Sequence, residues 1–236
     1  MMIPSRPTYH HGDLRNSLIR AALILVAERG VEGFSLREAA RTVGVSASAC
    51  YRHFADREEL LAAVAHEGIT TLAEQMRTAA AGHPGDNAFD AVNRFWDYSD
   101  AYLHFALEHP AHFRVMHAVP KSEHSRDLML PRSPAVLAQA GMDALVRAGV
   151  VAPEVAGRAL LACWTSVHGL ASLAVGGQLP LTDELTLEAA LDAVLRTAMI
   201  GAGVDPVLFP PEHPLPDGAC PGIAELIREA PDSALT

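Results

Sequence analysis

Polar and basic side chains that could contact phosphates or base edges gather in one short stretch of the chain, residues 46–57. Arginine can bond bidentately to guanine or to phosphate, whereas Tyr51 and His53 are better suited to donate to phosphate. The small side chains at positions 46–49 would let the backbone approach a partner closely. The composition of this stretch therefore indicates nucleic-acid recognition by Ser46, Ala47, Ser48, Tyr51, Arg52, His53 and Arg57.

Two short helices joined by a tight turn are predicted to hold these side chains. Ser35 and Glu38 have the spacing of a capping box, which starts a helix. Gly44 supplies the left-handed residue that ends it. Ser46 can N-cap the next helix, which should run roughly from Ser46 to Phe54. The pattern predicts a helix-turn-helix, the unit that places its second helix in a DNA major groove.

Two helix starts extend the expected contact surface. Ser35 and Arg37 lie at the first, and a second capping box of Asp56 and Glu59 starts another helix at Arg57. The free amides of a helix N-terminus attract phosphate, so Arg37 and Arg57 are predicted to contact the DNA backbone. Arg41 lies on the same compact unit, and three arginines together favour phosphate contact; ordinary solvated surface is the alternative for each of them.

Five ordered motifs in the N-terminal quarter share this organisation: Tyr9–Arg15, Ala27–Gly30, Ser35–Ala40, Gly44–Ser46 and Tyr51–Leu61. Together they make the chain resemble the TetR family of bacterial transcriptional regulators. The resemblance implies an all-helical homodimer with an N-terminal three-helix DNA-binding domain and a C-terminal effector domain. Many relatives have lysine where this chain has Arg57. Arginine keeps the charge and adds a bidentate fork, so the expected phosphate contact remains.

A second set of motifs lies in the C-terminal half. The segment Trp164-Thr-Ser-Val-His168-Gly169 resembles the signature of the WHG effector domain, which a subset of TetR-like proteins carries. Residues 102–114 are also typical of that subset. The resemblance implies a domain type and leaves the ligand open.

Composition limits the other possibilities. Half of the 236 residues are hydrophobic, enough to bury a large core in two domains. Neither a signal peptide nor an apolar run approaching the ~20 residues of a membrane span is expected, so no membrane partner and a cytoplasmic location are predicted. Three widely spaced cysteines argue against a disulfide framework.

The charge distribution fits a DNA-binding head on an acidic body. The net charge is −10, but residues 1–60 hold eight arginines and seven acidic residues, a charge of +1. The remainder therefore carries −11. A near-neutral head can bind DNA locally, with weak non-specific affinity, while the body stays clear of it.

The expected organisation is all-α. Residues 1–56 form an N-terminal arm and the helix-turn-helix domain, 57–85 a connecting helix, 86–203 a helical effector-binding and dimerisation domain, and 204–236 a proline-rich tail. Separate helices are expected at 88–98 and 101–109, and a proline-containing loop at 119–134.

Two long helices, predicted at 153–175 and 183–200, carry apolar stripes that suit a two-fold four-helix contact. The predicted dimer interface consists of Val155, Ala159, Ala162, Cys163, Val167, Leu187, Leu191, Val194, Leu195 and Ala198. The alternative is that both stripes only build the core of a single subunit.

Aromatic side chains are dense in the body and could line an apolar pocket with a few polar anchors. The predicted site for an unidentified small-molecule effector consists of Phe95, Trp96, Tyr98, Tyr102, Phe105, Phe113, Met116, Trp164 and His168. A plain core is the alternative for any one of these rings. Binding would move the connecting helix and change the separation of the two reading helices of a dimer.

The leading interpretation is a homodimeric, ligand-responsive repressor that binds a palindromic double-stranded DNA operator. The alternative is a helical small-molecule-binding protein or enzyme without DNA-binding activity. No Gly-x-Ser-x-Gly, phosphate loop or dinucleotide glycine pattern is present, so no catalytic residue and no cofactor are predicted. Four histidines, at 104, 109, 112 and 117, lack an acidic or cysteine partner that would complete a metal site, so no metal is expected.

Overall fold

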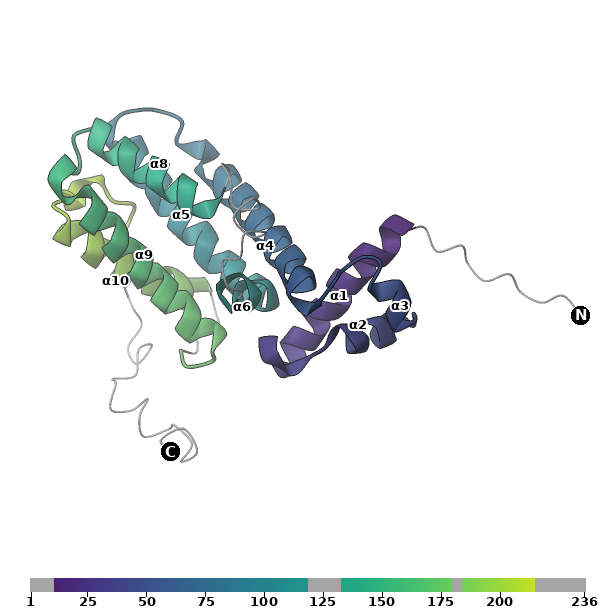
Figure 1. The fold of residues 1–236 in the computed structure, drawn as a ribbon. Coiled ribbons are helices and arrows are strands. Elements are labelled where there is room, and N and C mark those ends of the chain that lie inside the picture. The colour runs from purple at the N-terminus through teal and green to yellow at the C-terminus, as the bar shows by residue number, and fades with distance from the viewer. Residues whose placement is uncertain (1–10, 119–132, 180–183, 215–236) are drawn as a thin grey trace, which may run out of the picture. The chain divides into compact units, whose positions relative to one another are not determined.

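In the computed structural model, the described residues are 11–118, 133–179 and 184–214. Within these ranges the chain forms α-helices and short 3-10 helices, and no strand occurs among them. The all-α prediction is therefore confirmed (Figure 1). The expected N-terminal arm, most of the 119–134 loop and most of the C-terminal tail lie outside the described residues.

The first compact unit contains the described residues of Met1–Thr71 and His109–Pro131. It consists of α1 (His11–Arg29), η1 (Val31–Gly33), α2 (Leu36–Val43), α3 (Ala47–Cys50), the first part of α4 (Arg57–Ala79) and α6 (Pro110–Ala118). Its core is continuous and includes Leu18, Val26, Phe54, Leu60 and Val115. Leu18 and its neighbours recur at helical spacing along α1, which is why this helix buries one face.

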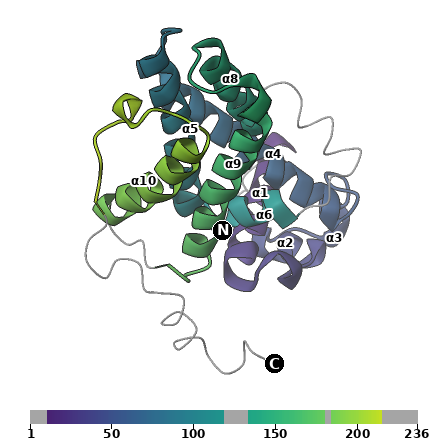
Figure 2. The same ribbon diagram turned by 90° about the vertical axis from the view of Figure 1, so that its left-hand side faces the viewer.

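The second unit contains the described residues of Leu72–Glu108 and Arg132–Thr236. After the end of α4 come η2 (Ala80–Gly82), α5 (Ala88–Glu108), α8 (Pro134–Arg147), α9 (Pro153–Val175), α10 (Glu184–Gly201) and η3 (Pro206–Leu208). Helices α9 and α10 lie side by side, and α5 packs against both of them and against α8 (Figure 1, Figure 2).

Three elements differ from the sequence-based expectation. Residues 88–108 form the single helix α5, because nothing between the two expected helices breaks the hydrogen-bond ladder. Helix α3 ends at Cys50, so residues 51–53 form a turn. Helix α6 belongs to the first unit, although the sequence placed its residues in the body.

Helix α9 is the most apolar long element. Over an 18-residue window its mean hydropathy is 1.2, and 28% of that window is buried. By length and composition alone this helix could cross a membrane, which the sequence analysis did not foresee. A single such helix is weak support for a membrane span, because core helices of globular proteins can have the same composition.

Candidate nucleic-acid interface

Side-chain caps fix both helices of the predicted helix-turn-helix. The Ser35 hydroxyl accepts from the Glu38 amide at 3.3 Å, and a Glu38 carboxylate oxygen accepts from the Ser35 amide at 2.9 Å. Gly44 ends α2 with φ 78° and ψ 27°, in the left-handed region. The Ser46 hydroxyl then accepts from the Ala49 amide at 3.2 Å and caps α3. These contacts confirm the predicted caps and the predicted turn residue, whereas the predicted helix end at Phe54 is wrong because α3 ends at Cys50.

Glu38 also connects α2 to the end of α1. Its carboxylate accepts from Nη1 of Arg29 at 2.9 Å and lies 3.7 Å from Nη2 of Arg41. Hydrogen bonds from Ser35, together with Arg29, lower the pKa of Glu38 below its usual value. The carboxylate is therefore ionised at neutral pH and holds the start of α2 against α1.

A small core supports the turn between the helices. Cys50 and Phe54 are fully buried, and the Cys50 thiol donates to the Leu36 carbonyl at 3.7 Å. Burial raises the pKa of the Cys50 thiol. The guanidinium carbon of Arg15 lies 5.1 Å from the centre of the Phe54 ring. Cys50 and Phe54 therefore serve packing, whereas their polar neighbours remain accessible.

The side chains most available to a partner form what we call the reading surface: Arg37, Ser46, Ser48, Tyr51 and Arg52, all exposed. Tyr51 is 48% exposed, so it does not close the core as Phe54 does. Ser46 and Ser48 share a 2.9 Å hydrogen bond between their hydroxyls. Tyr51 and Arg52 project from a turn and not from a helix, because α3 ends one residue earlier.

Three further predicted contact residues are either partly buried or already engaged in a hydrogen bond. Ala47 and His53 are partly buried, and Ser35 is exposed but engaged in the capping box. Arg41, which the sequence grouped with Arg37 and Arg57 as a possible phosphate contact, has a side chain that is 78% exposed. Its only sequence signal was a basic residue in the last turn of α2.

Arg57 is placed differently from the prediction. One guanidinium nitrogen, Nη2, donates to the Val31 carbonyl and lies 3.3 Å from a carboxylate oxygen of Glu32. The guanidinium carbon lies 5.4 Å from the centre of the Phe34 ring. The side chain is 27% exposed and makes these contacts within its own chain.

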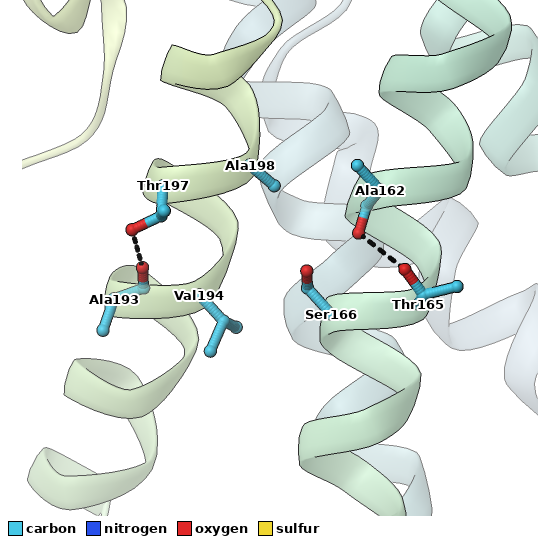
Figure 3. Close-up of a pocket in the computed structure, with 7 residues that line it drawn as sticks. All are labelled: Ala162, Thr165, Ser166, Ala193, Val194, Thr197 and Ala198. Carbon is cyan, nitrogen blue, oxygen red and sulfur yellow. Dashed lines mark hydrogen bonds between the residues drawn. The ribbon is translucent and has the colours of Figure 1, made fainter.

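A shallow groove of about 450 Å³ lies between α9 and α10 (Figure 3). The Thr165 hydroxyl donates to the Leu161 carbonyl at 2.8 Å, and the Thr197 hydroxyl donates to the Ala193 carbonyl at 2.7 Å. Because these hydroxyls are bonded within their own helices, the groove presents mainly methyl groups, together with the Ser166 hydroxyl. Its lining consists of Ala162, Thr165, Ser166, Ala193, Val194, Thr197 and Ala198.

The ten predicted dimer residues fall into three groups. Six are already buried within the subunit: Ala159, Cys163, Val167, Leu187, Leu191 and Leu195. Three line the groove, namely Ala162, Val194 and Ala198. Val155 is partly buried. The core of a single subunit therefore accounts for the six, and the apolar periodicity of the sequence could not separate them from the others.

Large apolar side chains outside the predicted dimer stripes are exposed on the two helices that form the groove. Leu161 is 59% and Trp164 50% exposed on α9, and Ile200 is 47% exposed on α10. We call Leu161, Ala162, Trp164, Val194 and Ala198 the apolar face. The missed signal was the lack of charge along α9 from Ala159 to Val175.

The predicted effector residues lie on α5, α6 and α9. Phe95 and Phe105 are buried, and Tyr98 is partly buried. The Trp96 ring packs on Phe209 and Arg196, with Arg196 held by Asp192. Phe113 and Met116 lie in α6, which belongs to the other unit.

Two polar members of the predicted effector site, Tyr102 and His168, are hydrogen-bonded to each other. The Tyr102 hydroxyl lies 2.8 Å from Nδ1 of His168, and the His168 ring stacks on Trp164 with centroids 5.4 Å apart. Nε2 of His168 lies 3.5 Å from the Ser172 hydroxyl. Burial lowers the pKa of His168 and raises that of Tyr102, so both groups are neutral at neutral pH. In the part of the chain that the structure describes, no group of three or more His, Cys, Asp or Glu residues could hold a metal.

Comparison with known proteins places two family models on the chain. Residues 18–64 match the model described as "Bacterial regulatory proteins, tetR family". Residues 97–198 match the "Tetracyclin repressor-like, C-terminal domain". The first range contains the whole helix-turn-helix, and the second contains Tyr102, Trp164 and His168.

Curated relatives are transcriptional regulators. The chain is 26% identical over 104 residues to an uncharacterized HTH-type transcriptional regulator, YobS, of Bacillus subtilis, covering 44% of this chain and 51% of the relative. It is 38% identical over 60 residues to the HTH-type transcriptional repressor AcnR of Corynebacterium diphtheriae, covering 25% of this chain and 32% of that protein. The matched region thus spans about half or less of these relatives.

Solved structures share the fold over most of the chain. A protein of unknown function from Rhodococcus sp. RHA1 is 29% identical, with a TM-score of 0.65, over 84% of this chain and 99% of that one. A bacterial regulatory protein in the tetR family from Rhodococcus RHA1 is 21% identical, with a TM-score of 0.61, over 81% of this chain and 98% of that one.

Proposed function

This chain belongs to the TetR family of bacterial regulatory proteins, and we propose that it represses transcription as a ligand-responsive homodimer on a palindromic operator. The observation that carries the proposal is the reading surface. Exposed side chains of Arg37, Ser48, Tyr51 and Arg52 project from a capped and well-packed helix-turn-helix. Family membership points to a regulator and not to an enzyme.

The side chains of the reading surface divide by role. Arg52 is the candidate for a bidentate contact to guanine, which would read sequence. Arg37 and Tyr51 are the candidates for phosphate contacts, which would position the head without reading bases. Because residues 1–60 carry a charge of only +1, few phosphate contacts are expected and non-specific affinity should be weak.

The apolar face supports a homodimer. Exposed Leu161 and Trp164 beside a methyl-lined groove form an unusual surface for a protein with a net charge of −10. A second copy that contributes the same helices would bury these groups in a four-helix contact. The helix-turn-helix units of the two subunits would then bind the two half-sites of a palindrome.

The effector site is proposed around Tyr102, Trp164 and His168. Neutral Tyr102 and His168 supply a polar anchor, and the Trp164 ring, which stacks on the His168 ring, supplies an apolar wall. An effector that binds the DNA-incompetent state more tightly would lower the population of the competent one. Action on chromosomal DNA in a bacterium implies a cytoplasmic location.

A mobility-shift assay tests the proposal. Double-stranded fragments enriched from a randomised library by the wild-type chain would be compared with unselected DNA at two salt concentrations. A palindromic consensus that is bound well above background supports the proposal. If no sequence is enriched and no shifted band forms at low salt, the chain lacks DNA-binding activity. That result would favour the alternative, a small-molecule-binding protein.

A further inference from the structure

The first residue of α4 turns its side chain back onto the segment between α1 and α2. Arg57 donates through Nη2 to the Val31 carbonyl, and the same nitrogen lies 3.3 Å from Oε2 of Glu32. Its guanidinium also lies over the Phe34 ring, at 5.4 Å from the ring centre. Arg57 therefore contacts three residues of the Val31–Phe34 segment, which directly precedes the Ser35 cap of α2.

Burial supports an internal role for this arginine. Phe34 is 5% exposed, so the ring under the guanidinium belongs to the core of the unit. Nε of Arg57 is buried and makes no hydrogen bond to any residue that the structure describes. A phosphate ligand would instead present its guanidinium to solvent, as the exposed Arg37 and Arg52 can.

The charges around the start of α4 oppose a phosphate at this place. Asp56, Glu58 and Glu59 lie beside Arg57, and all three are exposed. The Asp56 carboxylate accepts from the Glu59 amide at 2.7 Å, and the Glu59 carboxylate accepts from the Ala55 amide at 2.6 Å. The carboxylates thus already cap this helix end, and they would repel an anion.

We propose that Arg57 is a positioning residue of the DNA interface: it fastens the first turn of α4 to the Val31–Phe34 segment, sets where α2 begins, and does not touch DNA. The inference rests on the proposed function, because positioning has a purpose only if the helix-turn-helix binds DNA. It replaces the phosphate contact that the sequence predicted for this residue.

Arginine suits this role and lysine does not. A planar guanidinium can donate to a carbonyl and a carboxylate at its edge while its face stacks on an aromatic ring. An ammonium group is a point charge that would lose the stacked geometry. The substitution Arg57→Lys therefore separates positioning from phosphate binding, since it keeps the charge and removes the planar contacts.

The main test measures DNA affinity against salt for the full chain, with fragments enriched from a randomised library by the wild type. For Arg57→Lys and Arg57→Met we expect affinity to fall roughly tenfold at fixed salt, as loss of a stacked, charge-assisted contact implies. The slope of log affinity against log salt should not change. The matched control Arg37→Met, at an exposed residue in the first turn of α2, should lower that slope by about 1.

Two results would overturn the proposal. One is wild-type affinity for Arg57→Lys, because a phosphate contact tolerates lysine. The other is a slope for Arg57→Met that falls as far as the slope for Arg37→Met. If the wild type binds no DNA at all, the proposed function fails instead, and that failure is visible in the wild-type measurement alone.

A second measurement does not depend on DNA. The Gly33 amide donates to the Gly30 carbonyl at 3.2 Å within the segment that Arg57 holds. In Arg57→Met this amide should exchange its hydrogen about tenfold faster than in the wild type, whereas Arg52→Met, at an exposed residue, should leave the rate unchanged. Equal rates in all three proteins would show that Arg57 does not hold the segment.

Discussion

The reading surface and the apolar face are both exposed, but they offer opposite chemistry. On α2, α3 and the following turn, the exposed groups are guanidinium, hydroxyl and phenol groups. On α9 they are the side chains of Leu161, Ala162 and Trp164, and on α10 the partly buried Val194 and Ala198 line the groove. The hydroxyls of the nearby threonines are bonded within their own helices. The first surface is stable in water and can exchange water for phosphate. The second surface is stabilised only when another apolar surface covers it and removes it from water.

The two surfaces are also held in different ways. Hydrogen bonds from side chains to backbone amides, at Ser35 and Ser46, fix the reading surface residue by residue. The apolar face results from helix packing. One side of α9 and one side of α10 pack against each other and against α5, and the opposite sides of these two helices are less buried. Local changes should therefore disturb the first surface, and only a change of polarity should disturb the second.

The largest expected effect is a charge placed in the groove. Ala162→Arg would force an uncompensated guanidinium into the proposed dimer contact and weaken association by about 3 kcal/mol, or roughly a hundredfold. Sedimentation equilibrium measures the association constant. The control is Ala140→Arg, at an exposed position of α8. Wild-type association of Ala162→Arg would mean that this face does not form the dimer.

Removing the proposed base-reading side chain comes next. Arg52→Ala should weaken binding to the enriched sequence by about 1–3 kcal/mol and relax the preference at one base pair. Arg37→Ala should weaken binding to all sequences alike. Competition assays on a panel of single-base variants distinguish the two patterns. A change of preference confined to Arg37→Ala would reverse our assignment of these two arginines.

A substitution of Gly44, the glycine between α2 and α3, has a smaller expected effect. Gly44 has φ 78°, so Gly44→Ala should lower the free energy of unfolding by about 1 kcal/mol through backbone strain. Gly157→Ala is the control, because Gly157 lies inside α9 with no heavy atom within 4 Å of an added Cβ. That change should be neutral or stabilising. Urea unfolding measures both, and equal losses would count against a special role for Gly44.

The smallest expected effect is a pH dependence at Glu38. Its pKa is lower in the folded state than the ordinary value of 4.5, so its contribution to stability is present above that value. The contribution is lost as pH falls through the lower folded-state pKa. Between pH 6 and pH 3, wild-type stability should therefore fall more than that of Glu38→Gln. Parallel pH profiles from thermal unfolding would contradict this link between α1 and α2.

Local sequence signals made the helix-turn-helix predictable. The helix starts at Ser35 and Ser46 and the end at Gly44 depend on residues within four positions, so the sequence contained them in full. The body was less predictable because its stripes are ambiguous. Ala162 and Cys163 are adjacent in one apolar helix, yet one lines the groove and the other is buried. Only the packing of α5 and α10 against α9 separates them.

The sequence by itself determined the all-helical class, the capped helix-turn-helix and the family, because these follow from short-range hydrogen bonding and ordered motifs. The tertiary structure decided which charged and apolar groups are free to act. It placed Arg57 against Phe34, grouped α6 with the head, and left Leu161 and Trp164 exposed. The physical reason is that burial depends on residues distant in sequence, whereas capping depends on neighbours.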